Sequence, residues 1–234
     1  MPTPSQHDEL LALIRARVIV SCQATPDGPL DDPGIIAALA ASAADGGAAG
    51  FRIDGPANVR AVRAQSALPI IGIRKVDTPG FAVRITPTLA DGLVVVEAGA
   101  QIVALDATTR PRPGGEKLSG IVDGLHRAGA IVMGDVATVE EGAYARDAGV
   151  DILACTLAGY TEETADLDSS GPALEVLSGL TSFGLPVIAE GRIWTIDDAR
   201  ACLKAGAWAL VIGSAATAPD KITQHFTSAL DLYR

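Results

Sequence analysis

Aromatic residues are scarce in this sequence, which is 48% hydrophobic but only 4% Phe, Trp or Tyr. A core must therefore be built from Ala, Val, Ile and Leu. An all-β sandwich usually contains more Thr and aromatic residues, so the composition argues against that fold class. The 234 residues suit one large domain with ample core, and we expect residues 1–234 to form it.

Positive charge is also in short supply. The chain has 18 Lys and Arg against 28 Asp and Glu, a formal net charge of −10. Surfaces that bind nucleic acid or an anionic membrane need clustered Lys and Arg, so we expect neither partner. No apolar run is long enough to span a bilayer. An anionic small molecule is still compatible, because a few aimed backbone amides and one Arg bind it locally.

Cysteine is limited to three scattered residues without the spacing of a metal site: Cys22, Cys155 and Cys202. An odd number in a chain of this size suits reduced thiols rather than a disulfide framework. The N-terminal residues also lack the basic start and apolar core of a signal peptide. Together these features predict a cytoplasmic protein.

One short sequence pattern recurs along the chain. A Gly follows an Ala-rich amphipathic segment and precedes an apolar run, as in EAGAQIVAL (97–105) and KAGAWALVI (204–212). Such a Gly is typical of the end of a helix, and an uninterrupted apolar run is typical of a parallel strand buried on both faces. Eight candidate strands result: 18–23, 50–53, 70–75, 102–106, 131–135, 152–156, 187–190 and 210–213.

Eight strands that each precede a plausible helix predict a single-domain (β/α)8 TIM barrel. We expect residues 8–17 to form an additional N-terminal helix that closes the bottom of the barrel. An open doubly wound sheet is the alternative, although its G-x-G-x-x-G fingerprint is absent after the first strand.

Polar residues stand at the ends of seven of the eight predicted strands: Gln23, Arg52, Lys75, Asp106, Asp135, Thr156 and Glu190. In a barrel these ends form the active site. We expect Lys75 and Glu190, on strands across the barrel from each other, to approach a common centre. Removal from water favours the neutral amine of Lys75, which is a usable base. Arg52 and Asp135 add a donor and an acceptor for hydroxyl groups or an amide.

The turns after the last two strands predict a phosphate site. Glu190-Gly191-Arg192 and Ile212-Gly213-Ser214 contain glycine where many barrels bind phosphate with backbone N–H groups. A single Gly would be weak evidence, because tight turns need Gly in any case. The pair after these two strands favours a phosphorylated substrate.

Neither a metal nor a redox cofactor is expected. Asp106, Asp135 and Glu190 would bind Mg²⁺ only if they converged, and Lys75 in their midst would compete with the ion. A Lys at a strand end is also the nucleophile of Schiff-base aldolases and lyases. Such an enzyme, acting on a phosphorylated substrate such as a sugar phosphate, is therefore one alternative, and a non-catalytic protein that only binds such a phosphosugar is another.

Several motifs resemble those of the N-acetylmannosamine-6-phosphate 2-epimerases. They are IVSCQA (19–24), IIGIRK (70–75), ITPT (85–88), ALDATTRPRP (104–113), LAGYT (157–161), AEGRI (189–193) and GSAATAPDKITQHF (213–226). The matches keep their order over nearly the whole chain. The resemblance implies a (β/α)8 isomerase without a cofactor. It would interconvert the 6-phosphates of N-acetylmannosamine and N-acetylglucosamine in sialic acid breakdown.

The resemblance also implies roles for individual residues. Lys75 would be the acid/base that exchanges the C2 proton, with Glu190 as its partner. The sugar would be held by Gln23, Arg52, Asp135 and Tyr160, and the phosphate by Gly191, Arg192, Gly213 and Ser214. Two stretches depart from the family pattern: Ile53-Asp54 after Arg52, where Ala and then Asn or Gln are usual, and Ala218, where Arg is usual. The oligomeric state is left open, with a homodimer as one option.

Overall fold

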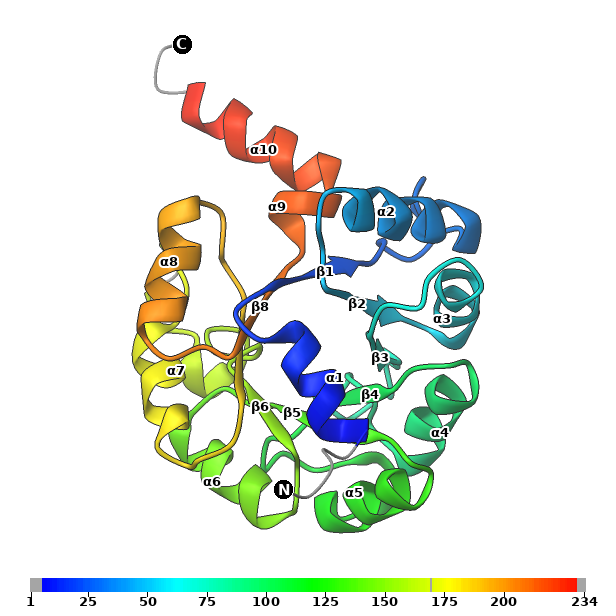
Figure 1. Ribbon diagram of the computed structural model, residues 1–234. Helices are drawn as coiled ribbons and strands as arrows, with labels where there is room; N and C mark the ends of the chain where they lie inside the picture. The colour runs from blue at the N-terminus through cyan, green and yellow to red at the C-terminus, as the bar shows by residue number, and fades with distance from the viewer. Residues whose placement is uncertain (1–5, 169, 231–234) are drawn as a thin grey trace.

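The apolar runs are the strands of one parallel sheet that closes on itself (Figure 1). The structure describes residues 6–168 and 170–230. Its strands are β1 (Val18–Cys22), β2 (Gly50–Asp54), β3 (Ile70–Ile73), β4 (Ile102–Asp106), β5 (Ile131–Asp135), β6 (Ile152–Ala154), β7 (Val187–Glu190) and β8 (Ala209–Ile212). Because β8 pairs with β1, the (β/α)8 barrel is confirmed and the open sheet is wrong. No predicted strand end differs from the observed one by more than two residues.

Helices follow the strands and surround the barrel (Figure 1). They are α2 (Pro33–Asp45), α3 (Pro56–Arg63), α4 (Leu89–Glu97), α5 (Leu118–Arg127), α6 (Val139–Asp147), α7 (Leu174–Thr181) and α8 (Ile196–Lys204). The recurring Gly lies just past several of these helices, as at Gly99 and Gly206, with φ of 110° and 100°. Gly adopts this conformation without steric cost, and the chain can therefore turn directly from helix into strand.

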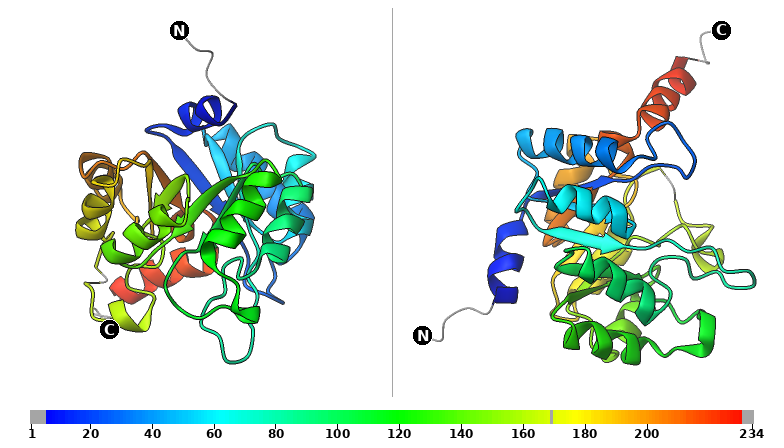
Figure 2. Two further views of the ribbon diagram at one scale, coloured as in Figure 1. Left: turned by 90° about the horizontal axis from the view of Figure 1, so that it is seen from below. Right: turned by 90° about the vertical axis from the view of Figure 1, so that its right-hand side faces the viewer.

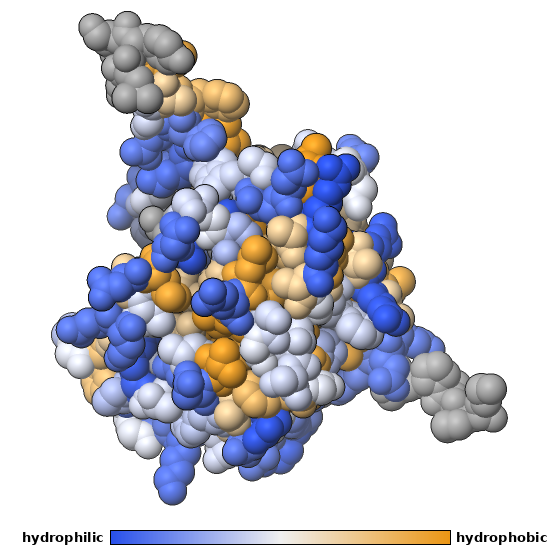
Figure 3. All heavy atoms as spheres, turned by 90° about the vertical axis from the view of Figure 1, so that its left-hand side faces the viewer, coloured by the Kyte–Doolittle hydropathy of each residue, from blue (hydrophilic) through white to orange (hydrophobic). Residues whose placement is uncertain are grey.

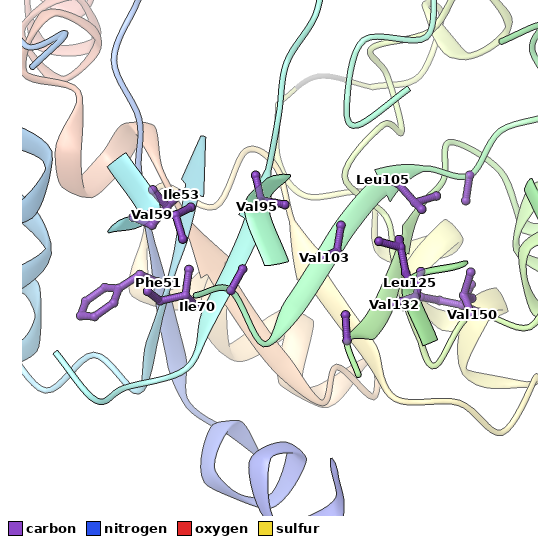
Figure 4. Packing of buried hydrophobic residues seen from close by; sticks show 14 of the residues in the cluster. Phe51, Ile53, Val59, Ile70, Val95, Val103, Leu105, Leu125, Val132 and Val150 are labelled. Carbon is purple, nitrogen blue, oxygen red and sulfur yellow. The ribbon is translucent and has the colours of Figure 1, made fainter. Parts of the chain in front are cut away.

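Buried side chains form two layers, because successive residues of a strand point to opposite faces. Ile71, Ile131 and Ile188 belong to the cluster inside the barrel. Phe51 and Val103 belong to the cluster between the strands and the helices (Figure 4). The polar residues at the strand ends lie an even number of positions after inward-facing residues of the same strands. Their side chains therefore also point inward, into the C-terminal mouth of the barrel.

Helix α1 (Gln6–Ile14) lies across the N-terminal end of the barrel (Figures 1 and 2). Ile14 is fully buried with the inner cluster, and Trp208 Nε1 donates to the Leu11 carbonyl at 3.0 Å. The predicted closing helix is confirmed, but it ends before residue 17 because Ala16 has a φ of 55°. The ends of the predicted 1–234 domain, residues 1–5 and 231–234, lie outside the described residues.

The chain after β8 departs from the ring of helices. A short helix, α9 (Ser214–Thr217), leads into α10 (Pro219–Leu230), which stands out from the molecular surface (Figures 1 and 3). No residue of α10 is buried, and Phe226 and Leu230 are 66% and 59% exposed. In the described part of the chain, no helix is long and apolar enough to cross a membrane.

Candidate active site at the C-terminal mouth of the barrel

A cavity of about 800 Å³ opens at the C-terminal ends of the strands. Its wall includes eight of the ten predicted site residues: Gln23, Lys75, Tyr160, Glu190, Gly191, Arg192, Gly213 and Ser214. The other two, Arg52 and Asp135, lie beneath it, almost completely buried. The predicted site residues thus come from seven of the eight βα units and meet at one place.

Arg52 is the centre of a buried polar network across the barrel. Its NH2 and NH1 atoms donate to the two oxygens of Asp135 at 2.6 and 3.1 Å. Its NH1 atom also donates to Oε2 of Glu190 at 2.8 Å. The Nε atom is the only buried side-chain polar atom of the described residues without a hydrogen-bond partner. The guanidinium thus ties β2 to β5 and β7 through its terminal nitrogens.

Burial and charge set the protonation of this network. Burial raises the pKa of Glu190 to about 7, with the charge of Arg52 opposing the rise and that of Asp135 adding to it. Burial acts to lower the pKa of Arg52, but Asp135 and Glu190 outweigh it and the pKa is raised. Arg52 therefore stays cationic, whereas Glu190 can gain or lose a proton near neutral pH.

Thr156 joins the same network although sequence reasoning gave it no role beyond its place at a strand end. Its Oγ1 lies 2.8 Å from Oδ1 of Asp135 and 3.3 Å from Oε2 of Glu190. The sequence does indicate that Thr156 points into the barrel, because it lies two residues after Ala154, which faces inward. With Oε2 of Glu190 held by Arg52 and Thr156, the carboxyl group is fixed at the cavity wall.

Lys75 lies two residues beyond the end of β3 and reaches toward β1. Its Nζ donates to Oε1 of Gln23 at 2.5 Å, and Nε2 of Gln23 donates to the Ser21 hydroxyl at 2.7 Å. Although Lys75 is solvent-exposed, the surrounding walls desolvate its ammonium and lower its pKa. The charge of Arg52 adds to this lowering, while those of Asp54 and Glu190 oppose it. A neutral amine is thereby made more accessible.

The structure places Lys75 and Glu190 in one cavity but not in an ion pair. Among the described residues, hydrogen bonds connect Lys75 to Gln23 and Glu190 to Arg52 and Thr156. Glu190 acts on Lys75 only through space. The two groups are thus held separately, and a substrate between them would meet an amine on one side and a carboxyl group on the other.

The corner after β7 and β8 contains the predicted phosphate residues. Gly191 and Arg192 both have a positive φ, at 109° and 55°, which forms the tight turn there. The guanidinium of Arg192 donates to the carbonyls of Gly171 and Ala158 at 2.7 and 3.0 Å. It also lies over the ring of Tyr160, 5.4 Å from its centroid. Arg192 thus braces the neighbouring loops at this corner of the cavity.

Asp106 does not line the cavity, although it stands at the end of β4 just as Glu190 stands at the end of β7. Its carboxylate accepts from Arg110 at 2.7 Å and from the Thr108 hydroxyl at 2.7 Å. In the described ranges 6–168 and 170–230, no group of three or more His, Cys, Asp or Glu is placed to hold a metal ion. Asp135 and Glu190 do converge, but on the guanidinium of Arg52, which already forms an ion pair with each of them.

Comparison with known proteins decides the family. The model described as "Putative N-acetylmannosamine-6-phosphate epimerase" matches residues 36–232. The chain belongs to this family. A relative in Edwardsiella ictaluri is described as a "Putative N-acetylmannosamine-6-phosphate 2-epimerase". It is 43% identical to this chain, and the match covers 91% of this chain and 88% of the relative. One in Aliivibrio fischeri is 40% identical over 97% and 95% of the two chains.

A solved structure agrees with this membership. The N-acetylmannosamine-6-phosphate 2-epimerase from Clostridium perfringens has a TM-score of 0.92 and 35% identity, covering 98% of this chain and 100% of its own. The deoxyribose phosphate aldolase from Aeropyrum pernix reaches a TM-score of 0.64 at 19% identity, which shows a shared fold alone. The family resemblance inferred from the motifs is confirmed.

Proposed function

We propose that this epimerase-family protein inverts C2 of N-acetylmannosamine 6-phosphate to give N-acetylglucosamine 6-phosphate, with residues 1–234 acting as one domain. The observation that carries the proposal is Lys75, an amine with a lowered pKa, in one cavity with the carboxyl group of Glu190. Sugar hydroxyls and the acetamido group are held by Gln23 and Tyr160 at the wall, above buried Arg52 and Asp135.

The proposed chemistry is a proton exchange next to a carbonyl group. In the open-chain aldehyde the C2 proton is acidic, because the electron pair it leaves behind delocalises onto the C1 oxygen. Neutral Lys75 removes this proton and becomes an ammonium. The enolate is then reprotonated on its opposite face, by the Lys75 ammonium or by a second acid opposite it, and the other epimer results. Glu190, with a pKa of about 7, supplies or accepts the proton needed to open and close the sugar ring. No electron leaves the substrate, so the reaction needs no redox cofactor.

Deuterium incorporation tests the reaction type. With N-acetylmannosamine 6-phosphate in D₂O, the N-acetylglucosamine 6-phosphate formed should carry deuterium at C2, which mass spectrometry and NMR detect. A panel of hexosamine 6-phosphates, resolved by product, would define the substrate. An epimerised product with protium retained at C2 in every molecule would contradict the proposed proton exchange.

Borohydride distinguishes the proposal from a Schiff-base aldolase that uses Lys75. An imine between Lys75 and a substrate carbonyl would be reduced to a stable secondary amine, which peptide mass spectrometry would locate. We expect Lys75 to remain unmodified after borohydride treatment with substrate. Turnover of any N-acylamino sugar phosphate would also exclude a protein that only binds.

Glu190→Gln should slow turnover and change its pH dependence. Gln keeps the shape and accepts the hydrogen bond of Arg52, so the barrel should survive. Glu190 loses its proton as the pH rises through its pKa of about 7, and the parent rate should fall there if the protonated carboxyl is the donor. We expect kcat to drop by roughly tenfold or more and this decline to disappear. Unchanged kcat and pH profile would show that Glu190 takes no part.

Ala218→Arg probes the corner proposed to bind phosphate. Ala218 lines the cavity beside Gly213 and Ser214, and an Arg there would donate two hydrogen bonds to a phosphate. We expect binding of a hexosamine 6-phosphate to tighten by about 1–3 kcal/mol, seen as a lower KM with kcat nearly unchanged. Lys221 also lines the cavity. An unchanged KM in Ala218→Arg, together with a raised KM in Lys221→Met, would mean that Lys221 already supplies this contact.

We also propose a cytoplasmic homodimer. The three cysteines are unpaired and buried, as in a protein of a reducing compartment. Helix α10 exposes Phe226 and Leu230, and a second copy would remove them from water. Light scattering should give the mass of two chains, and Phe226→Ser should weaken this association. A monomer at all concentrations would contradict the dimer.

A further inference from the structure

Lys75 is held in place by a side chain rather than by the regular ladder of the sheet. The pairing of β2 with β3 ends at Asp54 and Ile73, two residues before Lys75. Beyond that point, the backbone N–H of Lys75 donates to Oδ1 of Asp54 at 3.0 Å. The Asp54 carboxylate thus continues the connection between the two strands past the last backbone pair.

The other edge of Lys75 is fixed by the loop that follows it. Lys75 forms an isolated antiparallel bridge with Ile85, and the Val76 N–H donates to the Arg84 carbonyl at 2.9 Å. The main chain at Lys75 is therefore clamped between Asp54 on one side and this loop on the other. With the main chain fixed in this way, Nζ reaches past β2 to Gln23, the residue that follows β1.

The charge of Asp54 acts on the same residue. The groups that face the Lys75 ammonium are Asp54 and Arg52 from β2, Gln23 from the end of β1, Glu190 from β7 and Arg84 from the loop after β3. Burial lowers the pKa of Lys75 most, and Arg52 and Arg84 lower it further. Asp54 is the strongest opposing influence, followed by Glu190.

We infer that Asp54 is a positioning residue for Lys75, with two separable effects: its Oδ1 atom fixes the Lys75 backbone at the mouth, and its negative charge stabilises the ammonium form. The inference rests on the proposed function in taking Lys75 as the acid/base. A group that removes a proton in one step and returns one in another works best when both of its forms are accessible. Asp54 keeps the desolvated amine from becoming too weak a base.

Two variants separate the effects. Asp54→Asn retains an oxygen that accepts from the Lys75 N–H but removes the charge, whereas Asp54→Ala removes both. Asp123→Asn is the matched control, because it removes one charge at an exposed position of α5. Thermal unfolding of all three variants would show whether each is folded before further comparison.

Competitive acylation measures the charge effect without any substrate. The fraction of Lys75 acylated by acetic anhydride, followed against pH by mass spectrometry of its peptide, gives the pKa of this amine directly. We expect Asp54→Asn and Asp54→Ala to lower that pKa by about 0.5 unit or more, a typical influence of one nearby charge. Asp123→Asn should leave it unchanged. An unchanged pKa in Asp54→Asn would overturn the charge effect.

Turnover at the pH optimum of each variant measures the positioning effect. Asp54→Asn should keep kcat within about threefold of the parent, while Asp54→Ala should lose about tenfold or more because Lys75 is no longer fixed. Equal kcat in these two variants would overturn the positioning role. Because the acylation experiment needs no catalysis, a parent without C2 exchange would count against the proposed function and leave the measured Lys75–Asp54 coupling standing.

Discussion

Lys75→Met should lower kcat for C2 exchange by roughly 10²–10⁴-fold, which is the usual contribution of a positioned acid/base. Met retains the apolar stem of the side chain and removes only the amine. Since the fold depends on the buried clusters rather than on Lys75, whose side chain is exposed, the unfolding transition should change little. Steady-state kinetics with product-resolved detection would measure the loss, and KM should change far less than kcat.

Lys204→Met is the appropriate control, because Lys204 is an exposed residue in the last turn of α8. It removes the same charge from the chain but none from the cavity, and its kcat should equal that of the parent. Near-normal turnover in Lys75→Met would show that Lys75 is an ordinary polar strand end. In that case the base would have to be sought elsewhere in the cavity.

Arg52→Met should destabilise the protein more than any other single change considered. The variant leaves the carboxylates of Asp135 and Glu190 buried and close together without their cation. Breaking a buried ion pair in this way costs about 3–5 kcal/mol. Urea unfolding followed by circular dichroism would measure the loss.

The same variant should become more sensitive to pH. Glu190 has a folded pKa already raised to about 7, and loss of Arg52 removes the charge that opposes this rise. The folded state then binds more protons than the unfolded state between the unfolded and folded pKa values, so stability falls as the pH increases through this window. We expect Arg52→Met to be more stable at pH 5.5 than at pH 8. Arg200→Met, which disrupts only an exposed pair with Asp197, should cost less than about 1 kcal/mol at either pH.

The fold was predictable because the composition, the apolar runs and the glycines at helix ends all indicate the same structure. The apolar runs are short, and a Gly follows the helical segment before most of them, as at Gly99 and Gly206. Helix α10 is the exception. Its sequence predicts an amphipathic helix, but whether such a helix packs on the barrel or stands away depends on contacts between distant segments, which local patterns do not encode.

The site was predictable in its location more than in its connections. Side chains alternate between the two faces of a strand with a period of two residues. This alternation alone places Lys75, Glu190 and Arg52 on the inner face at the mouth, without any knowledge of side-chain contacts. Alternation cannot tell which polar groups pair across the barrel. The sequence therefore did not show that Arg52 binds both Asp135 and Glu190, or that Arg192 is held by backbone carbonyls. Those pairings arise from the closure of the barrel.

The position of the cavity has a kinetic consequence. Helix α1 covers the N-terminal end of the barrel, where Ile14 is buried with the inner cluster, and the cavity opens at the opposite end. Substrate and product of the proposed reaction would share this one cavity. Two epimers that differ only at C2 present the same groups elsewhere and would compete for the same cavity, so each should inhibit conversion of the other competitively. Their specificity constants are then linked by the Haldane relation, and the ratio of forward to reverse kcat/KM must equal the equilibrium constant between the two sugars. The direction of net flux is consequently set by whichever reaction removes one epimer from solution.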